Sequence, residues 1–132
     1  MNRLASMAAT FVIVAVLSAC ARQTMPIEGR WKLNVSKTTA NAQSLGLPAD
    51  VVEDIRNRMG VTRLKIDRTS VTVSRPGVTD VDRRELLIHT KEGDCLMLSL
   101  KGNDGQHRYC RDGGHLIVKE PRNDLVFVYD RD

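Results

Sequence analysis

The feature that most constrains the fold is a series of short runs in which apolar and polar residues alternate, beginning at Thr62. Turn residues interrupt the series every eight to twelve positions, a spacing typical of an antiparallel sandwich or barrel. An earlier run, WKLNV, has the same alternation. The pattern predicts eight strands, at 31–35, 63–67, 70–75, 84–90, 95–100, 106–111, 115–120 and 125–130.

Most links between these strands are of hairpin length, which favours an up-and-down meander. Closing a meander removes the exposed edges that invite aggregation. We therefore expect a mainly β fold, a small antiparallel up-and-down barrel or half-barrel of about eight strands. A barrel of this size is either filled by side chains or holds one small ligand. The residues expected to face the interior, and to bind any ligand there, are Trp31, Leu33, Leu64, Ile66, Val71, Val73, Leu86, Ile88, Leu98, Leu116, Val118 and Phe127.

One helix is predicted after the first strand. Pro48 suits a first helical turn, Val52, Ile55 and Met59 recur on one face, and Gly60 is a stop signal. The narrow apolar stripe predicts a helix that caps or flanks the barrel. The preceding stretch, 38–44, is polar and is expected to form a turn.

The beginning of the chain has the pattern of a targeting signal. Arg3 precedes an apolar stretch, residues 7–17, that is too short to span ~30 Å of hydrocarbon. At its end, Leu17-Ser18-Ala19-Cys20 resembles the lipobox of bacterial lipoproteins. The resemblance implies a diacylglyceryl group on Cys20, removal of a signal peptide at 1–19, a lipidated tether at 20–27 and a β domain at 28–132. An ordinary cleaved signal with a chance cysteine is the alternative.

The same resemblance implies a location. A lipoprotein of this kind is anchored in the bacterial cell envelope, its contact with the membrane made through the acyl chains. In the sorting pattern of enteric lipoproteins, an aspartate directly after the lipidated cysteine favours the inner membrane. Ala21 stands at this position, so the chain resembles outer-membrane lipoproteins. We therefore expect a domain that faces the periplasm from the outer membrane.

The remaining cysteines, Cys95 and Cys110, are predicted to form a disulfide, because an oxidising compartment favours their pairing. They flank the turn-rich stretch 101–105. If Leu100 faces Gly105, equal counting along both strands sets the cysteines directly opposite each other, and opposed residues point to the same side of a sheet. A redox-active pair is the alternative, but the chain has no C-x-x-C motif.

The segment GRWKLN resembles the Gly-x-Trp opening strand of the calycin group, the lipocalins and fatty-acid-binding proteins, through Gly29 and Trp31. The predicted order of strand, helix and antiparallel strands is similar as well. In lipocalins the tryptophan packs at the closed barrel end beneath a basic residue near the last strand, a place that Arg131 would take here. The ligand-holding Arg-x-Tyr pair of fatty-acid-binding proteins is missing, because Phe127 stands two residues before Tyr129. The resemblance therefore implies no particular ligand.

Several kinds of chemistry are disfavoured. The formal net charge of +4, which includes Arg3 in the signal, is too small to indicate nucleic acid. His89, His107, His115 and Cys110 fit no common zinc spacing, and no motif sets a serine beside a base. We expect no enzyme, no metal and no cofactor.

Two classes of function remain. In the first, the barrel interior binds a small apolar or amphiphilic envelope molecule. In the second, the interior is packed and an outer surface contacts a periplasmic protein, as in an inhibitor, an immunity protein or a complex subunit. The basic loop from Arg75 to Arg84 is the first contact site expected for the second class. An empty apolar interior of ~300 Å³ or more would support the first class, and a filled one the second.

Overall fold

The computed structural model describes residues 25–75, 81–103 and 105–132 of the chain. Their elements are β1 (Gly29–Leu33), α1 (Val35–Ser44), α2 (Ala49–Arg58), β2 (Arg63–Ile66), β3 (Ser70–Ser74), β4 (Asp82–Glu92), β5 (Cys95–Leu100), β6 (His107–Asp112), β7 (His115–Lys119) and β8 (Val126–Arg131). The predicted signal peptide, Cys20 and most of the tether lie outside the described residues. Within the described part of the chain, no helix is both long and apolar enough to cross a membrane.

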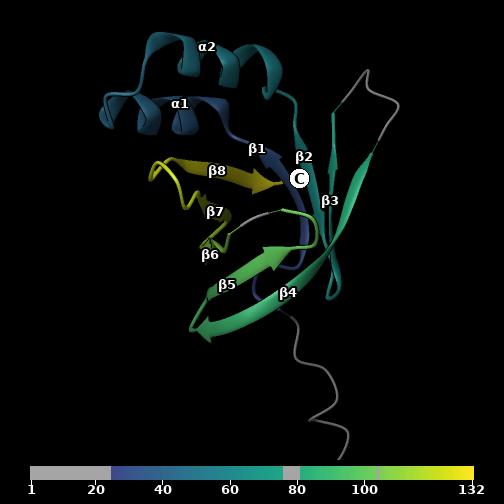
Figure 1. Cartoon of the computed structure of the whole chain (residues 1–132). Helices are drawn as coiled ribbons and strands as arrows, with labels where there is room; N and C mark the ends of the chain where they lie inside the picture. The colour runs from purple at the N-terminus through teal and green to yellow at the C-terminus, as the bar shows by residue number, and fades with distance from the viewer. Residues whose placement is uncertain (1–24, 76–80, 104) are drawn as a thin grey trace, which may run out of the picture.

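The strands form a closed antiparallel barrel in chain order, with β8 returning to pair with β1. Figure 1 shows β1 running toward the end of the barrel where the two helices lie. The predicted up-and-down barrel is confirmed, and every predicted strand is found within two residues of its expected bounds. Alternation explains this agreement, since β1, β2, β5 and β7 bury every second side chain toward the interior.

The predicted helix is found as α2, but the expectation of a single helix was wrong. The stretch 38–44, expected to form a turn, belongs to a second helix, α1. Its signal is a polar cap: the Asn34 side chain accepts a hydrogen bond from the Lys37 amide at 2.9 Å. The helix buries Thr38 and Thr39, and the Thr39 hydroxyl donates to the Val35 carbonyl at 2.8 Å. A helix that buries hydroxyls bonded to the backbone shows no apolar stripe.

Helix α1 completes the seam between the first and last strands. The ladder between β1 and β8 covers Trp31 to Leu33, and β8 continues beyond it. There the amides of Val128 and Val126 donate to Thr38 Oγ1 at 3.0 Å and to Asn41 Oδ1 at 2.9 Å. The Asn34 amide donates to the Val128 carbonyl at 2.7 Å. Side chains of α1 thus take the place of the strand that β8 lacks on this side.

Strand β4 departs from regular alternation. The register of β4 against β5 shifts between Ile88 and Thr90, which marks a β-bulge at His89. Ile88 pairs with the buried Leu98, yet Ile88 is 39% exposed. The prediction that Ile88 lines a closed interior was therefore wrong. Bulges of this kind bend a strand locally, and β4 stays paired with β5 beyond this point, as far as Glu92.

Candidate functional site

The barrel interior is the site that the sequence pointed to, and its predicted residues meet there. Nine of the twelve are buried, Val73 and Leu86 are half-buried against the same core, and Ile88 is exposed. The buried ones are Trp31, Leu33, Leu64, Ile66, Val71, Leu98, Leu116, Val118 and Phe127. The structure adds Leu96, Leu100, Tyr109 and Tyr129 to the interior, residues that alternation along β5, β6 and β8 would have found.

These side chains fill the space around them. Trp31, Leu98 and Leu116 have exposed fractions of 0%, and that of Leu96 is 1%. A space large enough for a water molecule would leave part of the adjoining side chains accessible. The centre of the barrel around these four residues is therefore occupied by side chains.

One end of the interior is closed by Trp31 and Arg131. The Trp31 indole donates to the Ile27 carbonyl at 2.9 Å, and the Arg131 guanidinium lies over its ring, 4.3 Å from the centroid. Arg131 Nη1 also donates to the Glu28 carbonyl at 3.0 Å. Gly29 has φ +138°, and Arg131 Nη1 occupies the place that a Cβ would take. The position expected for a basic residue above the tryptophan is confirmed.

Two buried phenols face the interior. Burial raises the pKa of the Tyr109 hydroxyl above its ordinary range, and the Glu120 carboxylate adds to the effect. Burial likewise raises the pKa of Tyr129, with Tyr109 and Glu120 adding and Arg75 opposing. Both hydroxyls are therefore neutral at physiological pH.

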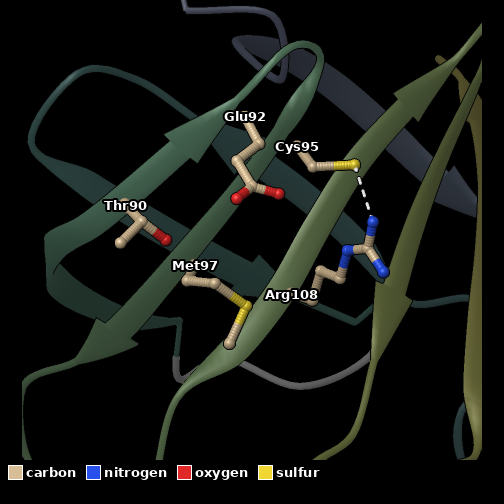
Figure 2. A pocket seen from close by; sticks show the side chains of 5 residues that line it. All are labelled: Thr90, Glu92, Cys95, Met97 and Arg108. Carbon is tan, nitrogen blue, oxygen red and sulfur yellow. Dashed lines mark hydrogen bonds between the residues drawn. The ribbon is translucent and has the colours of Figure 1, made fainter.

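The predicted disulfide is confirmed and lies on the outside of the barrel. Cys95 and Cys110 are directly opposed in β5 and β6, with their Cα atoms 4.0 Å apart. Outward-facing neighbours on both sides form a hollow of about 270 Å³, lined by Thr90, Glu92, Cys95, Met97 and Arg108. Figure 2 shows Glu92 and Thr90 on the β4 side and Arg108 on the β6 side, donating to Cys95 Sγ at 3.6 Å.

An exposed apolar side chain stands beside this hollow. Leu87 is 62% exposed and pairs with Ser99, on the outward side of the sheet that also carries Met97. We call Leu87 together with the five residues of the hollow the disulfide face. The cross-strand disulfide ties β5 to β6 within this face.

A second hollow lies between α2 and the barrel. It measures about 420 Å³ and has an apolar floor with charged residues at the rim. The floor consists of Val51, Ile55, Met59, Leu125 and Phe127, and the rim of Asp50, Asp54 and Arg58. Of the predicted ligand-binding residues, Phe127 reaches this groove.

The arrangement closest to catalytic chemistry joins α1 to β7 and β8. His115 Nδ1 lies 2.7 Å from Asp130 Oδ1, and His115 Nε2 lies 3.2 Å from Lys37 Nζ. A Lys37 ammonium can only donate, so Nε2 accepts and Nδ1–H donates to Asp130. Asn34 Nδ2 donates to the other Asp130 oxygen at 2.9 Å. The imidazole is thereby engaged on both nitrogens, which makes this chain of contacts a brace for α1.

The four residues considered and disfavoured as metal ligands have other contacts. Within the three described stretches, no group of three or more His, Cys, Asp or Glu side chains is placed to hold a metal ion. Cys110 is in the disulfide, His115 in the brace, and His89 Nε2 lies 2.9 Å from Ser99 Oγ. His107 Nε2 lies 3.9 Å from Glu120 Oε2.

No protein-family model matches the chain, and no curated protein sequence matches it at a significant level. The likeness to the calycin group thus rests on the barrel and on Gly29, Trp31 and Arg131.

Proposed function

We propose that the protein is a non-catalytic, lipid-anchored envelope protein that binds a partner protein through the disulfide face. The observation that carries the proposal is the filled interior, with Trp31, Leu98 and Leu116 fully buried. A barrel without interior space has its outer surface available for recognition. The barrel fold by itself is compatible with small-ligand binding, and the packing of its core favours the other class.

The disulfide face has the composition of a protein-binding surface. Met and Arg are enriched in protein interfaces, and Met97 and Arg108 flank the hollow. Hot-spot residues commonly insert into pockets of a rigid partner, and the hollow beside Leu87 offers such a pocket. Half of the other surface expected for protein contact, the loop from Arg75 to Arg84, lies outside the described residues, namely 76–80.

The anchor is supported by the resemblance of residues 17–20 to a lipobox and by the disulfide, which is typical of an oxidising compartment. Ala21 supports placement in the outer membrane, with the domain in the periplasm. Labelled palmitate should enter the wild-type protein and fail to enter Cys20→Ser. Equal labelling of both, or none of the wild type, would overturn the anchor.

Photo-crosslinking tests the protein-binding function in cells of the host. A photoreactive residue at position 87 should give one discrete protein adduct, whereas the same residue at Val61, 50% exposed beyond α2, should not. The adduct should disappear with Met97→Glu and persist with Leu45→Glu, a change at an exposed apolar residue that ends α1, away from the disulfide face. Adducts of equal yield from both positions, or an adduct insensitive to Met97→Glu, would reject the disulfide face.

Small-ligand binding is a second candidate, favoured by the groove between α2 and β8, whose 420 Å³ lies within the size range of ligand sites. Native mass spectrometry of the full chain in detergent separates the two. A reproducible small mass that is lost with Val51→Glu and kept with Met97→Glu would assign ligand binding to this groove and displace the first proposal.

A further inference from the structure

A cationic row crosses the outer surface of the barrel at the end where the chain enters it. Arg30 of β1 lies directly opposite Lys65 of β2, Lys65 opposite Thr72 of β3, and Thr72 opposite Arg83 of β4. Directly opposed residues share one side of a sheet, and Arg30, Lys65 and Arg83 are exposed. Three positive charges are therefore gathered across four neighbouring strands.

The charge of this row is only partly balanced within the described part of the molecule, because Asp132, whose amide donates to the Arg30 carbonyl at 3.0 Å, lies opposite Arg30. Neither Arg30 nor Lys65 forms an ion pair with a described residue, and Arg83 Nε donates to the neutral Ser70 hydroxyl at 3.2 Å. The Asp132 carboxylate is engaged by Arg63 of the next row at 3.1 Å, and in that row Lys32 lies opposite Asp130. Like charges directly opposed in a sheet are destabilising. An external anion would therefore stabilise the opposed Arg30 and Lys65.

The row lies close to the tether, which favours a membrane lipid as the source of this anion. Four residues separate Cys20 from Met25, so an extended chain places a lipid on Cys20 within roughly 18 Å of Met25. Ile27 is fully buried at this end, and a turn joins the Glu28 amide to the Met25 carbonyl at 3.0 Å. Arg30 follows directly in β1. The helices lie at the opposite end of the barrel (Figure 1).

We propose that the cationic row of Arg30, Lys65 and Arg83 docks the barrel on an anionic phospholipid surface beside the anchor. This proposal rests on the lipidation of Cys20 in the proposed function. The acyl chains hold the domain at the bilayer, and the row sets its orientation, with the helices and the groove beneath α2 directed away from the membrane. Each basic side chain near an anionic surface shifts the docking equilibrium about fivefold, and salt weakens the effect.

Energy transfer tests the orientation with the full, lipidated chain. The single tryptophan, Trp31, follows Arg30, and serves as donor to a dansyl-labelled headgroup lipid in vesicles. Transfer should be greater in vesicles of 30% phosphatidylglycerol in phosphatidylcholine than in pure phosphatidylcholine, and 0.5 M salt should abolish the difference. The double variant Arg30→Gln/Lys65→Gln should shift the docking equilibrium by roughly 25-fold. Arg56→Gln/Arg122→Gln, which removes the same charge at other exposed positions, should behave as wild type.

Equal transfer in both vesicle types, or equal loss in both double variants, would overturn the proposal. Equal transfer would also be the result if the row binds an acidic protein. Intact mass measures lipidation separately, so a chain without lipid refutes the anchor alone. Flotation of that chain with the same two vesicle types then tests the row by itself.

Discussion

The guanidinium of Arg131 lies 4.3 Å from the centroid of the Trp31 ring and joins the last strand of the barrel to the first. The contact combines a cation–π interaction with a hydrogen bond to the Glu28 carbonyl, 3.0 Å away. It brings together residues 100 positions apart in the chain, at the end of the barrel opposite the helices.

Removing this contact should weaken the barrel measurably. Because Arg131 is exposed, we expect Arg131→Ala to lower the free energy of unfolding by about 1 to 2 kcal/mol, the sum of an exposed cation–π contact and one hydrogen bond. Urea titration followed by Trp31 fluorescence gives the value. Arg122→Ala is the matched control, because Arg122 is exposed and has no hydrogen-bond or ion-pair partner among the described residues. An unchanged midpoint for Arg131→Ala would contradict the role assigned to the contact.

Gly29 provides a second test of the contacts that Arg131 makes at this end of the barrel. Its φ of +138° strains any other residue, and a Cβ there would collide with Arg131 Nη1. Gly29→Ala should therefore cost at least about 1 kcal/mol in the wild-type background. In the Arg131→Ala background the collision is absent and only the backbone strain remains, so the cost should be smaller. Equal costs in the two backgrounds would show that Arg131 imposes no requirement at position 29.

Because Thr38 of α1 completes the seam with β8, we expect it to contribute more to the free energy of unfolding than an average surface threonine. Thr38→Val keeps the shape of the side chain but removes the acceptor of the Val128 amide, leaving a polar group of β8 unpaired. We expect a loss of about 1 to 3 kcal/mol in the free energy of unfolding. Thr72→Val, outward-facing on β3, should change it by less than about 0.5 kcal/mol. Similar midpoints for the two variants would count against the seam.

The disulfide should contribute through the ring that it closes. For the Cys95→Ser/Cys110→Ser variant, loop-closure entropy for a separation of 15 residues predicts a loss of about 3 kcal/mol. Chemical denaturation of the oxidised protein and the double serine variant measures the difference. Addition of a reductant should destabilise the wild type and leave the variant unaffected. A variant as stable as the oxidised wild type would contradict the expectation.

Acid sensitivity should trace to Asp67 in the turn between β2 and β3. The Thr69 amide, opposed in part by burial and reinforced by the Ser70 hydroxyl and amide, lowers the pKa of Asp67 from 3.8 to about 2. The folded state therefore binds this proton less readily than the unfolded state. The resulting stabilisation is fully present above about pH 4 and is lost as the pH falls toward 2. Asp67→Asn should flatten the pH dependence of the urea midpoint in that window, and an unchanged slope would exclude Asp67 as its source.

The strands and the disulfide could be predicted because both depend on local rules. Side chains alternate along a strand, and turn residues mark its ends, so the register of Cys95 and Cys110 follows by counting from the turn. Helix α2 shows an apolar stripe and was found, whereas α1 buries threonine hydroxyls against β8, and that partner is 90 residues away in sequence. The search for helical periodicity considers only the spacing of apolar residues, so it does not reveal a polar contact of this kind.

The candidate site depends on features that no single segment contains. The exposure of Ile88 follows from a bulge, which alternation does not reveal. The hollow on the disulfide face is bounded by side chains from three strands, including Thr90 just after that bulge and Arg108 on β6. Whether the interior is filled depends on how the volumes of side chains such as Trp31 and Tyr109 add up across the barrel. The alternation of apolar and polar residues indicates which side chains face inward. It does not determine whether those side chains fill the interior.

The hydrogen bond from the Asp132 amide to the Arg30 carbonyl has a mechanical consequence. The first and last strands leave the barrel at the same place, so tension applied between the two ends of the described chain acts on the last rungs of the β1–β8 ladder first. Such a load breaks the hydrogen bonds of the ladder one after another and does not load them all at once. A barrel that is cooperative toward heat or denaturant should therefore yield to a small pulling force.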